Sequence, residues 1–166
     1  MVLKDFLSAV HDEVRDRMAA DATSTGGAPQ FAELAFTTVF ARHMAERGIT
    51  YDPQACRYFA SVDHQDLRLS GYALSDELDR LDAFVSVYSG DAEPRSISEQ
   101  DALDAAGQCG RFLEMSAGGT LAKHVDASHD AFPLISTIGS AWHGMSQVRI
   151  HVLTDMCAGT MFLPSI

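Results

Sequence analysis

The stretch DLRLSGYALSDELDRLDAFVSVY, residues 66–88, decides the fold of this chain. It contains two runs rich in aliphatic and aromatic residues, 66–74 and 81–88, separated by the acidic connection SDELDR. Short runs of this composition between polar turns are typical of β-strands. A similar run, 56–62, precedes them across the turn-forming sequence Asp63-His64-Gln65-Asp66. We therefore predict three consecutive antiparallel strands.

Strict alternation of side chains divides these strands into two faces. In the 66–74 strand, one face is expected to carry Leu67, Leu69, Gly71 and Ala73, and the other Arg68, Ser70, Tyr72 and Leu74. In the 81–88 strand, Asp82, Phe84, Ser86 and Tyr88 share a face opposite Leu81, Ala83, Val85 and Val87. Chemistry on this sheet is expected on the rows that hold Arg68 and Asp82. Four members of those rows are therefore candidates for one small-ligand pocket: Ser70, Tyr72, Ser86 and Tyr88.

The segments before the strands have helical periodicity. Apolar residues recur at three- and four-residue steps over residues 3–20, which predicts an amphipathic helix. Residues 23–29 include two adjacent glycines and are expected to break that helix. Pro29 suits the first turn of a second helix that ends near Arg47, before Gly48. The wide apolar arc of this second helix predicts packing against the sheet.

The segments after the strands also alternate between helix and strand. Ser96 and Glu99 match a capping box, which predicts a helix that runs to Gly118-Gly119. Ser128 is expected to cap a further helix, and residues 148–153 to form the last strand. The fold class is therefore α/β, in the α+β sense, with the order ααβββα(α)αβ. We expect a central mixed sheet flanked by helices.

Composition restricts the classes of partner. A chain of 166 residues with 46% hydrophobic residues is long enough for one domain with its own core. The net charge of -11 disfavours binding to nucleic acids and to anionic membranes. Three widely spaced cysteines predict neither a disulfide framework nor a zinc site, and no apolar run is long enough for a membrane span. We expect a cytoplasmic protein without a cofactor.

The order of elements is similar to the core of the restriction-endonuclease-like superfamily. More closely, five pieces resemble the N-terminal domain of abortive-infection phage-resistance (AIPR) proteins: Phe31-Ala-Glu33, Leu69-Ser-Gly71-Tyr72-Ala, Leu81-Asp-Ala-Phe84-Val-Ser-Val-Tyr88, Phe112-Leu113 and Val148-Arg-Ile-His-Val-Leu153. The resemblance spans residues 28–155 and divides the chain into an N-terminal helix with its connector, 1–27, a core, 28–155, and an apolar tail, 156–166. It implies a nuclease-type fold ahead of a longer C-terminal region, in a protein of bacteriophage defence.

The resemblance also implies where a nuclease would hold its metal. The family has an acidic residue before the Gly-Tyr pair of the second strand, and Ser70 occupies that position here. A nuclease of this superfamily needs carboxylates for a divalent metal, with a lysine two residues after the third-strand acid. Asp82 is followed at that spacing by Phe84, and Glu33 on the second helix is the remaining candidate ligand.

Three hypotheses follow for the function. The preferred one is a non-catalytic or degenerate nuclease-like domain that acts as an interaction or sensing module, with a protein partner, a second copy of the chain or the rest of a longer chain as its partner. The alternative is a metal-dependent endonuclease that uses Glu33 and Asp82 with Mg²⁺ or Mn²⁺. The third is a small-ligand-binding domain that uses the pocket between the sheet and the second helix.

Overall fold

The computed structural model describes residues 3–25 and 30–158. The described chain forms the following elements: α1 (Leu3–Thr25), α2 (Gln30–Glu46), β1 (Pro53–Val62), β2 (Gln65–Leu74), β3 (Arg80–Val87), β4 (Ser96–Ile97), α3 (Glu99–Ala117), η1 (Leu121–Lys123), α4 (Phe132–Ala141), η2 (Trp142–Gly144), β5 (Gln147–Thr154) and β6 (Cys157–Ala158). This order confirms the predicted α/β class and the predicted succession of main elements.

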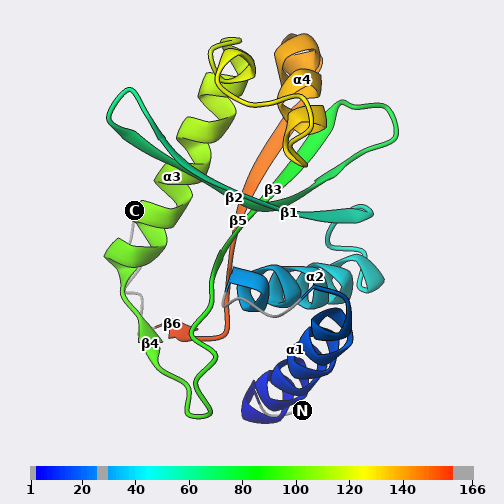
Figure 1. Ribbon diagram of the computed structural model, residues 1–166, viewed down its shortest axis with the longest axis vertical. Helices are drawn as coiled ribbons and strands as arrows, with labels where there is room; N and C mark the ends of the chain where they lie inside the picture. The colour runs from blue at the N-terminus through cyan, green and yellow to red at the C-terminus, as the bar shows by residue number, and fades with distance from the viewer. Residues whose placement is uncertain (1–2, 26–29, 159–166) are drawn as a thin grey trace, which may run out of the picture.

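The main sheet has the strand order β1-β2-β3-β5 (Figure 1). β1, β2 and β3 pair antiparallel, and β5 pairs parallel to β3. The two-residue turn between β1 and β2 is formed by Asp63 and His64, which both have positive φ. A parallel pair needs a crossover connection, and the segment that contains α3 and α4 provides it. The predicted mixed sheet is therefore confirmed.

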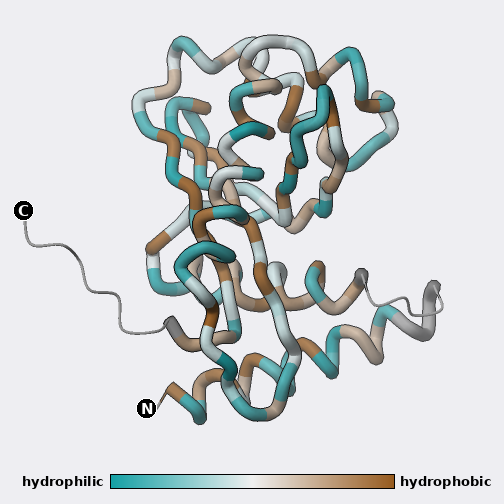
Figure 2. Tube along the Cα trace, turned by 90° about the vertical axis from the view of Figure 1, so that its left-hand side faces the viewer, coloured by the Kyte–Doolittle hydropathy of each residue, from teal (hydrophilic) through white to brown (hydrophobic). Residues whose placement is uncertain are grey.

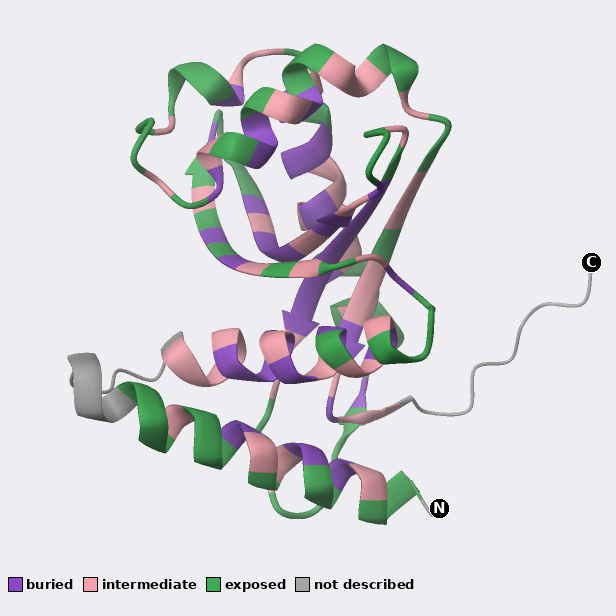
Figure 3. Cartoon of the chain, turned by 90° about the vertical axis from the view of Figure 1, so that its right-hand side faces the viewer, coloured by how far each residue is buried: buried purple, intermediate pink, exposed green. Residues whose placement is uncertain are grey.

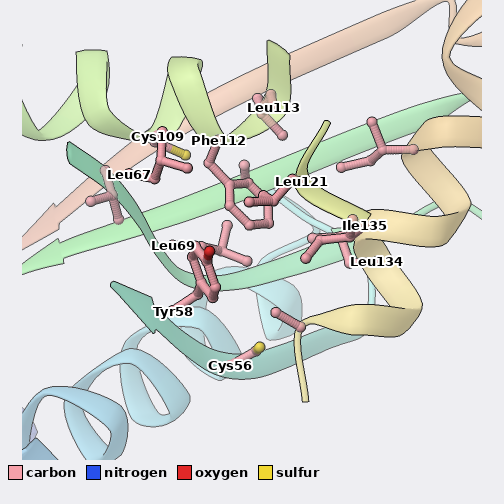
Figure 4. Packing of buried hydrophobic residues seen from close by; sticks show 14 of the residues in the cluster. Cys56, Tyr58, Leu67, Leu69, Cys109, Phe112, Leu113, Leu121, Leu134 and Ile135 are labelled. Carbon is pink, nitrogen blue, oxygen red and sulfur yellow. The ribbon is translucent and has the colours of Figure 1, made fainter. Parts of the chain in front are cut away.

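Each face of the sheet has its own hydrophobic core. On the side of α3 and α4, buried side chains such as Leu69, Phe112 and Ile135 pack together (Figure 4). On the opposite side, Val14 of α1 and Phe36 of α2 are fully buried in a second cluster. Figure 3 shows the buried residues of α1 on the side that faces α2. The sheet therefore lies between two helical layers.

The N-terminal helix is longer than predicted, because it continues to Thr25. Hydrophobic positions recur along it, as expected for an amphipathic helix (Figure 2). Residues 26–29, which include the predicted first-turn Pro29, lie outside the described chain. α2 ends at Glu46, and Gly48 follows with a φ of +69°, which confirms the predicted glycine stop. No described helix combines the length and the apolar character that crossing a membrane requires.

Two predicted helix caps were wrong. Ser98, rather than Ser96, caps α3, and its hydroxyl accepts a hydrogen bond from the Asp101 backbone N–H. Ser96 instead belongs to β4, which pairs parallel with β6. Ser128 lies in a turn held by Asp126, so α4 begins later, at Phe132. For α3, two nearby serines fitted the cap pattern, and the sequence alone did not choose between them; for α4, Ala131 precedes the helix and no side chain caps it.

The structure describes the first three residues of the predicted apolar tail, 156–166. Cys157 and Ala158 form β6 and pair with Ser96 and Ile97 of β4. The last strand therefore leads directly into a second, two-stranded sheet. Residues 159–166 lie outside the described part of the chain.

Strict alternation was wrong for the second half of β2. Leu67, Leu69 and Tyr72 all pack on the side of α3, so three steps separate Leu69 from the next residue on that face. Ser70 and Gly71 therefore both face α2, where Gly71 lies against Thr37. The pairing with β1 shifts by one residue at the same level, as in a β-bulge. The alternation predicted for β3 is confirmed.

Candidate functional site

Polar side chains from α2, β2 and β3 meet between the helix and the sheet; we call this group the Glu33 cluster, and its members are Glu33, Thr37, Arg68, Ser70 and Ser86. The Ser70 hydroxyl donates to Glu33 Oε1 at 3.0 Å and accepts from the Ser86 backbone N–H at 2.9 Å. The Thr37 and Ser86 hydroxyl oxygens lie 2.7 Å apart. Thr37 also donates to the Glu33 backbone carbonyl at 2.8 Å. The contacts form a closed ring, so its buried polar groups have partners.

Arg68 supplies the positive charge of the Glu33 cluster. Its Nη2 donates to Glu33 Oε2 at 3.2 Å and to the backbone carbonyl of Ser86. The two charged side chains are both largely buried, with 23% of Arg68 and 21% of Glu33 exposed. The Glu33 carboxylate therefore already has a counter-charge, supplied by a guanidinium that is never deprotonated in proteins.

A shallow pocket of about 230 Å³ opens beside this ion pair. It is lined by Glu33, Arg57, Tyr58, Phe59 and Arg68. Phe59 is 57% exposed, and it lies directly opposite Arg68 in the pairing of β1 with β2. Two guanidinium groups and one carboxylate give the pocket a formal charge opposite to that of a metal-binding site.

The second acid, Asp82, is buried in a different polar group on β3. Arg149 donates to both of its carboxylate oxygens, from Nε at 2.6 Å and from Nη2 at 2.7 Å, and the Thr50 hydroxyl donates at 2.6 Å. Burial raises the pKa of Asp82, but the hydrogen bonds from Arg149 and Thr50 together lower it below its ordinary value. The parallel register sets Arg149 directly opposite Asp82, which explains the bidentate pair. His151 Nε2 is a further 3.5 Å contact of this carboxylate.

Glu33 and Asp82 do not share a site. Glu33 contacts Ser70, which bonds to Ser86, and Ser86 lies four residues beyond Asp82 on the same strand. Four residues of an extended strand span roughly 13 Å, whereas two carboxylates on one ion must each lie within about 2.5 Å of it. The predicted pair of metal ligands is therefore not brought together. Asp82 is also not the solvated acid of a strand edge, because only 1% of the residue is exposed.

The predicted pocket residues are divided between three places. Ser70 and Ser86 are buried in the Glu33 cluster, where their hydroxyls are already bonded. Tyr72 packs on the opposite face, where it lines a cavity of about 360 Å³ with Cys56. Tyr88 directly follows β3 and lines a cavity beside α1. The split follows from the irregular step at Ser70, which turned Tyr72 to the other side.

The cavity beside Tyr72 does not contain an activated nucleophile. Burial and the nearby Asp130 carboxylate raise the pKa of the Cys56 thiol to about 11. Cys109, in the core of the same face, has its pKa raised to about 12 by burial. Both thiols are therefore protonated near neutral pH. Among residues 3–25 and 30–158, no group of three His, Cys, Asp or Glu side chains could hold a metal ion.

The sequence prediction missed the partners of both acids. Arg68 was predicted on the correct face of β2 but was given no role. Because Arg68 lies two residues before Ser70 on the strand, both side chains reach the Glu33 carboxylate. Thr37 lies one helical turn after Glu33, a spacing that would have indicated it. No sequence spacing indicated that Arg149 contacts Asp82. Their contact depends on the register between β3 and β5, which is set by how the crossover places β5.

The fold and its polar groups define a class: an α/β domain with three antiparallel strands, a helical crossover and a fourth, parallel strand, whose candidate carboxylates are each paired with an arginine. The family model of the abortive infection phage resistance protein N-terminal domain matches residues 36–166. The chain belongs to this family, which associates it with phage defence by abortive infection. The match includes Ser70 and Asp82 and begins within α2, after Glu33. The searches of curated proteins and of solved structures each gave no match.

Proposed function

We propose that this chain is a degenerate, non-catalytic nuclease-like domain that serves as an interaction or sensing module of an abortive-infection protein. One observation carries the proposal: the Glu33 carboxylate accepts hydrogen bonds from the Arg68 guanidinium and from the Ser70 hydroxyl. Ser70 occupies the position where the family resemblance implies an acidic residue. A divalent ion would have to compete with a fixed positive charge and would find one carboxylate instead of two.

The charge distribution supports the same proposal. Asp82, the other acid, is held by two hydrogen bonds from Arg149 and lies at a different level of the sheet. The net charge of the chain is -11, which opposes the approach of a phosphate backbone. Protein partners with neutral or basic surfaces are not disfavoured in this way. All three cysteines are free thiols, which supports a location in the reducing cytoplasm.

The experiment that tests the degenerate site is the restoration of its missing charge. Ser70→Asp combined with Arg68→Leu places two carboxylates together and removes the guanidinium. We expect the wild-type protein to show no Mn²⁺ binding in isothermal titration calorimetry and no Mn²⁺-dependent cleavage of plasmid DNA. The double variant is expected to gain measurable Mn²⁺ binding, because oxygen ligands bind hard cations.

A matched control separates a local site from a general change of charge. Ser140→Asp with Arg95→Leu makes the same charge change at exposed positions that do not line the pocket beside Glu33, and this variant is expected not to bind Mn²⁺. Mn²⁺-dependent cleavage by the wild-type protein that disappears in Glu33→Ala would refute the proposal. Equal Mn²⁺ binding by the two double variants would show that Glu33 and Ser70 do not form a latent site.

The interaction role is tested on the protein itself. Size-exclusion chromatography with light scattering, at two concentrations that differ tenfold, measures self-association. Affinity capture from phage-infected and uninfected cells measures partners. A monomer at both concentrations that captures no protein above the level of a bead control would contradict the interaction role.

A further inference from the structure

A cavity of about 210 Å³ lies between α1 and the segment that follows β3. One wall is a single stripe of α1, because Lys4, Ser8, His11 and Arg15 recur at helical spacing. The other wall includes Tyr88 and Gly90. The segment after β3 lies beside α1 in the ribbon view (Figure 1). α1 is outside the family match, so this cavity joins a helix of this particular chain to the family core.

The polar side chains that line the cavity are hydrogen-bond donors and cations, and they lie beside the apolar Leu7, Ala92 and Pro94. Lys4 and Arg15 carry full positive charges, and Ser8 and Tyr88 can each donate. None of the described residues that line the cavity carries a carboxylate. The acid partners of the two cations are outside its lining: Glu93 lies 3.8 Å from Lys4, and Asp12 contacts Arg15. These side chains are all more than half exposed, so the two ion pairs are weak and a ligand can compete with them.

Asp155, a buried carboxylate behind this wall, already has hydrogen-bond partners for both of its oxygens. Asp155 has no exposed side-chain surface and accepts from the backbone N–H groups of Ser89 and Gly90, at 2.8 and 2.9 Å. It also accepts from the Ser89 hydroxyl at 3.1 Å and contacts His11 Nε2 at 3.0 Å. Its charge is therefore compensated by dipoles and an imidazole, and its oxygens do not face a ligand. The bonds also fix the wall formed by the segment after β3.

We propose that this cavity binds a small molecule through a phosphate monoester group, with Lys4 and Arg15 as its charge partners and Tyr88 and Ser8 as neutral donors. The two cations and two neutral donors lie around one cavity of an otherwise acidic chain, and such a set of groups favours binding of an oxyanion. The volume is below the range of cavities for drug-sized ligands, which favours a sugar phosphate or free phosphate over a larger molecule. The inference is independent of the proposed degenerate site, because the two share no residue.

The test is a titration of the ¹⁵N-labelled chain, followed by ¹H–¹⁵N correlation spectra. The probes are ribose 5-phosphate, inorganic phosphate and ribose. We expect ribose 5-phosphate to shift the amide signals of Ser89, Gly90 and the first half of α1, and ribose to shift none of them. An equal response to inorganic phosphate would still support the oxyanion site and would identify free phosphate as sufficient. No shift with either phosphate at millimolar concentration would overturn the proposal.

Matched variants localise the binding. Lys4→Gln and Arg15→Gln are each expected to weaken ribose 5-phosphate binding about 10-fold, because each removes a charge-assisted hydrogen bond. Arg17→Gln makes the same charge change on the same helix, but Arg17 does not line this cavity, so its affinity should stay unchanged. Equal weakening by Arg17→Gln and Arg15→Gln would show a general charge effect and would refute the site. Unchanged signals of the core amides establish that each variant is folded.

Discussion

Asp82 is predicted to stabilise the fold, and a double-mutant cycle with Arg149 measures its contribution. Two charge-assisted hydrogen bonds join the pair, at 2.6 and 2.7 Å. Such bonds contribute roughly 1.5–3 kcal/mol each when buried. Asp82 is almost fully buried, but 38% of the Arg149 side chain is exposed, so solvent screens part of the attraction. We therefore expect a coupling energy of about 2 kcal/mol, which is about 30-fold in the folding equilibrium.

The assay is urea unfolding at pH 7 of the wild-type chain, Asp82→Ala, Arg149→Ala and the double variant. Asp82→Ala should cost about 3 kcal/mol, because it also leaves the Thr50 hydroxyl without its acceptor. Arg149→Ala should cost a similar amount, because it leaves a buried carboxylate without its counter-charge. The double variant should be less destabilised than the sum of the two. Additive losses, or an Asp82→Ala variant as stable as the wild type, would refute the reasoning.

The direction of the Asp82 pKa adds a pH dependence to the same measurement. Its pKa in the folded chain is lower than its ordinary value, so the folded state binds its proton less readily than the unfolded chain. The stabilisation is therefore fully present above the unfolded pKa of about 3.9 and is lost as the pH falls through the folded pKa. The coupling energy should decrease below pH 4, and a coupling that grows on acidification would contradict this sign.

Two further predictions concern other buried positions. Burial raises the pKa of Asp155, but hydrogen bonds from backbone N–H groups and from His11 outweigh it and hold the pKa below its ordinary value. In Asp155→Asn the melting temperature should therefore fall less steeply between pH 5 and about 3, the region around the ordinary pKa. An unchanged slope of melting temperature against pH would contradict this prediction. Gly71→Ala should cost about 1–3 kcal/mol in thermal unfolding, because the added Cβ would lie 2.8 Å from a backbone carbonyl of β1. Gly144→Ala, which meets no atom within 4 Å, is its control, and equal losses would refute the steric argument.

Local patterns in the sequence were sufficient for the elements and their class. The stretch 66–88 predicted two strands of a hairpin, and both strands are present with nearly the predicted ends. Gly48 predicted the end of α2 because a glycine easily adopts the positive φ found there. The alternation of β3 placed Asp82 and Ser86 on one face, as observed. In each case the deciding interaction lies within a few residues of the chain.

The candidate site was less predictable because its distances depend on the register between distant segments. Glu33 and Asp82 were predicted as possible partners, but they lie at different levels of the sheet. Tyr72 was predicted on the face of Ser70 and lies on the other, since an irregular step follows Ser70. Gly71 was the available signal, because a glycine inside a strand often marks a bulge or a close backbone approach.

The sequence by itself determined the elements, the α/β class and the serine at position 70, because helical and strand periods and residue identity are local properties. Only the tertiary structure decided that Arg68 neutralises Glu33 and that Arg149 holds Asp82. It also decided that α1 and the segment after β3 form a cavity whose lining includes Lys4 and Arg15. The two ion pairs join residues 35 and 67 positions apart, and the geometry of the pairs and of the cavity follows from strand register and helix packing, which no local pattern encodes.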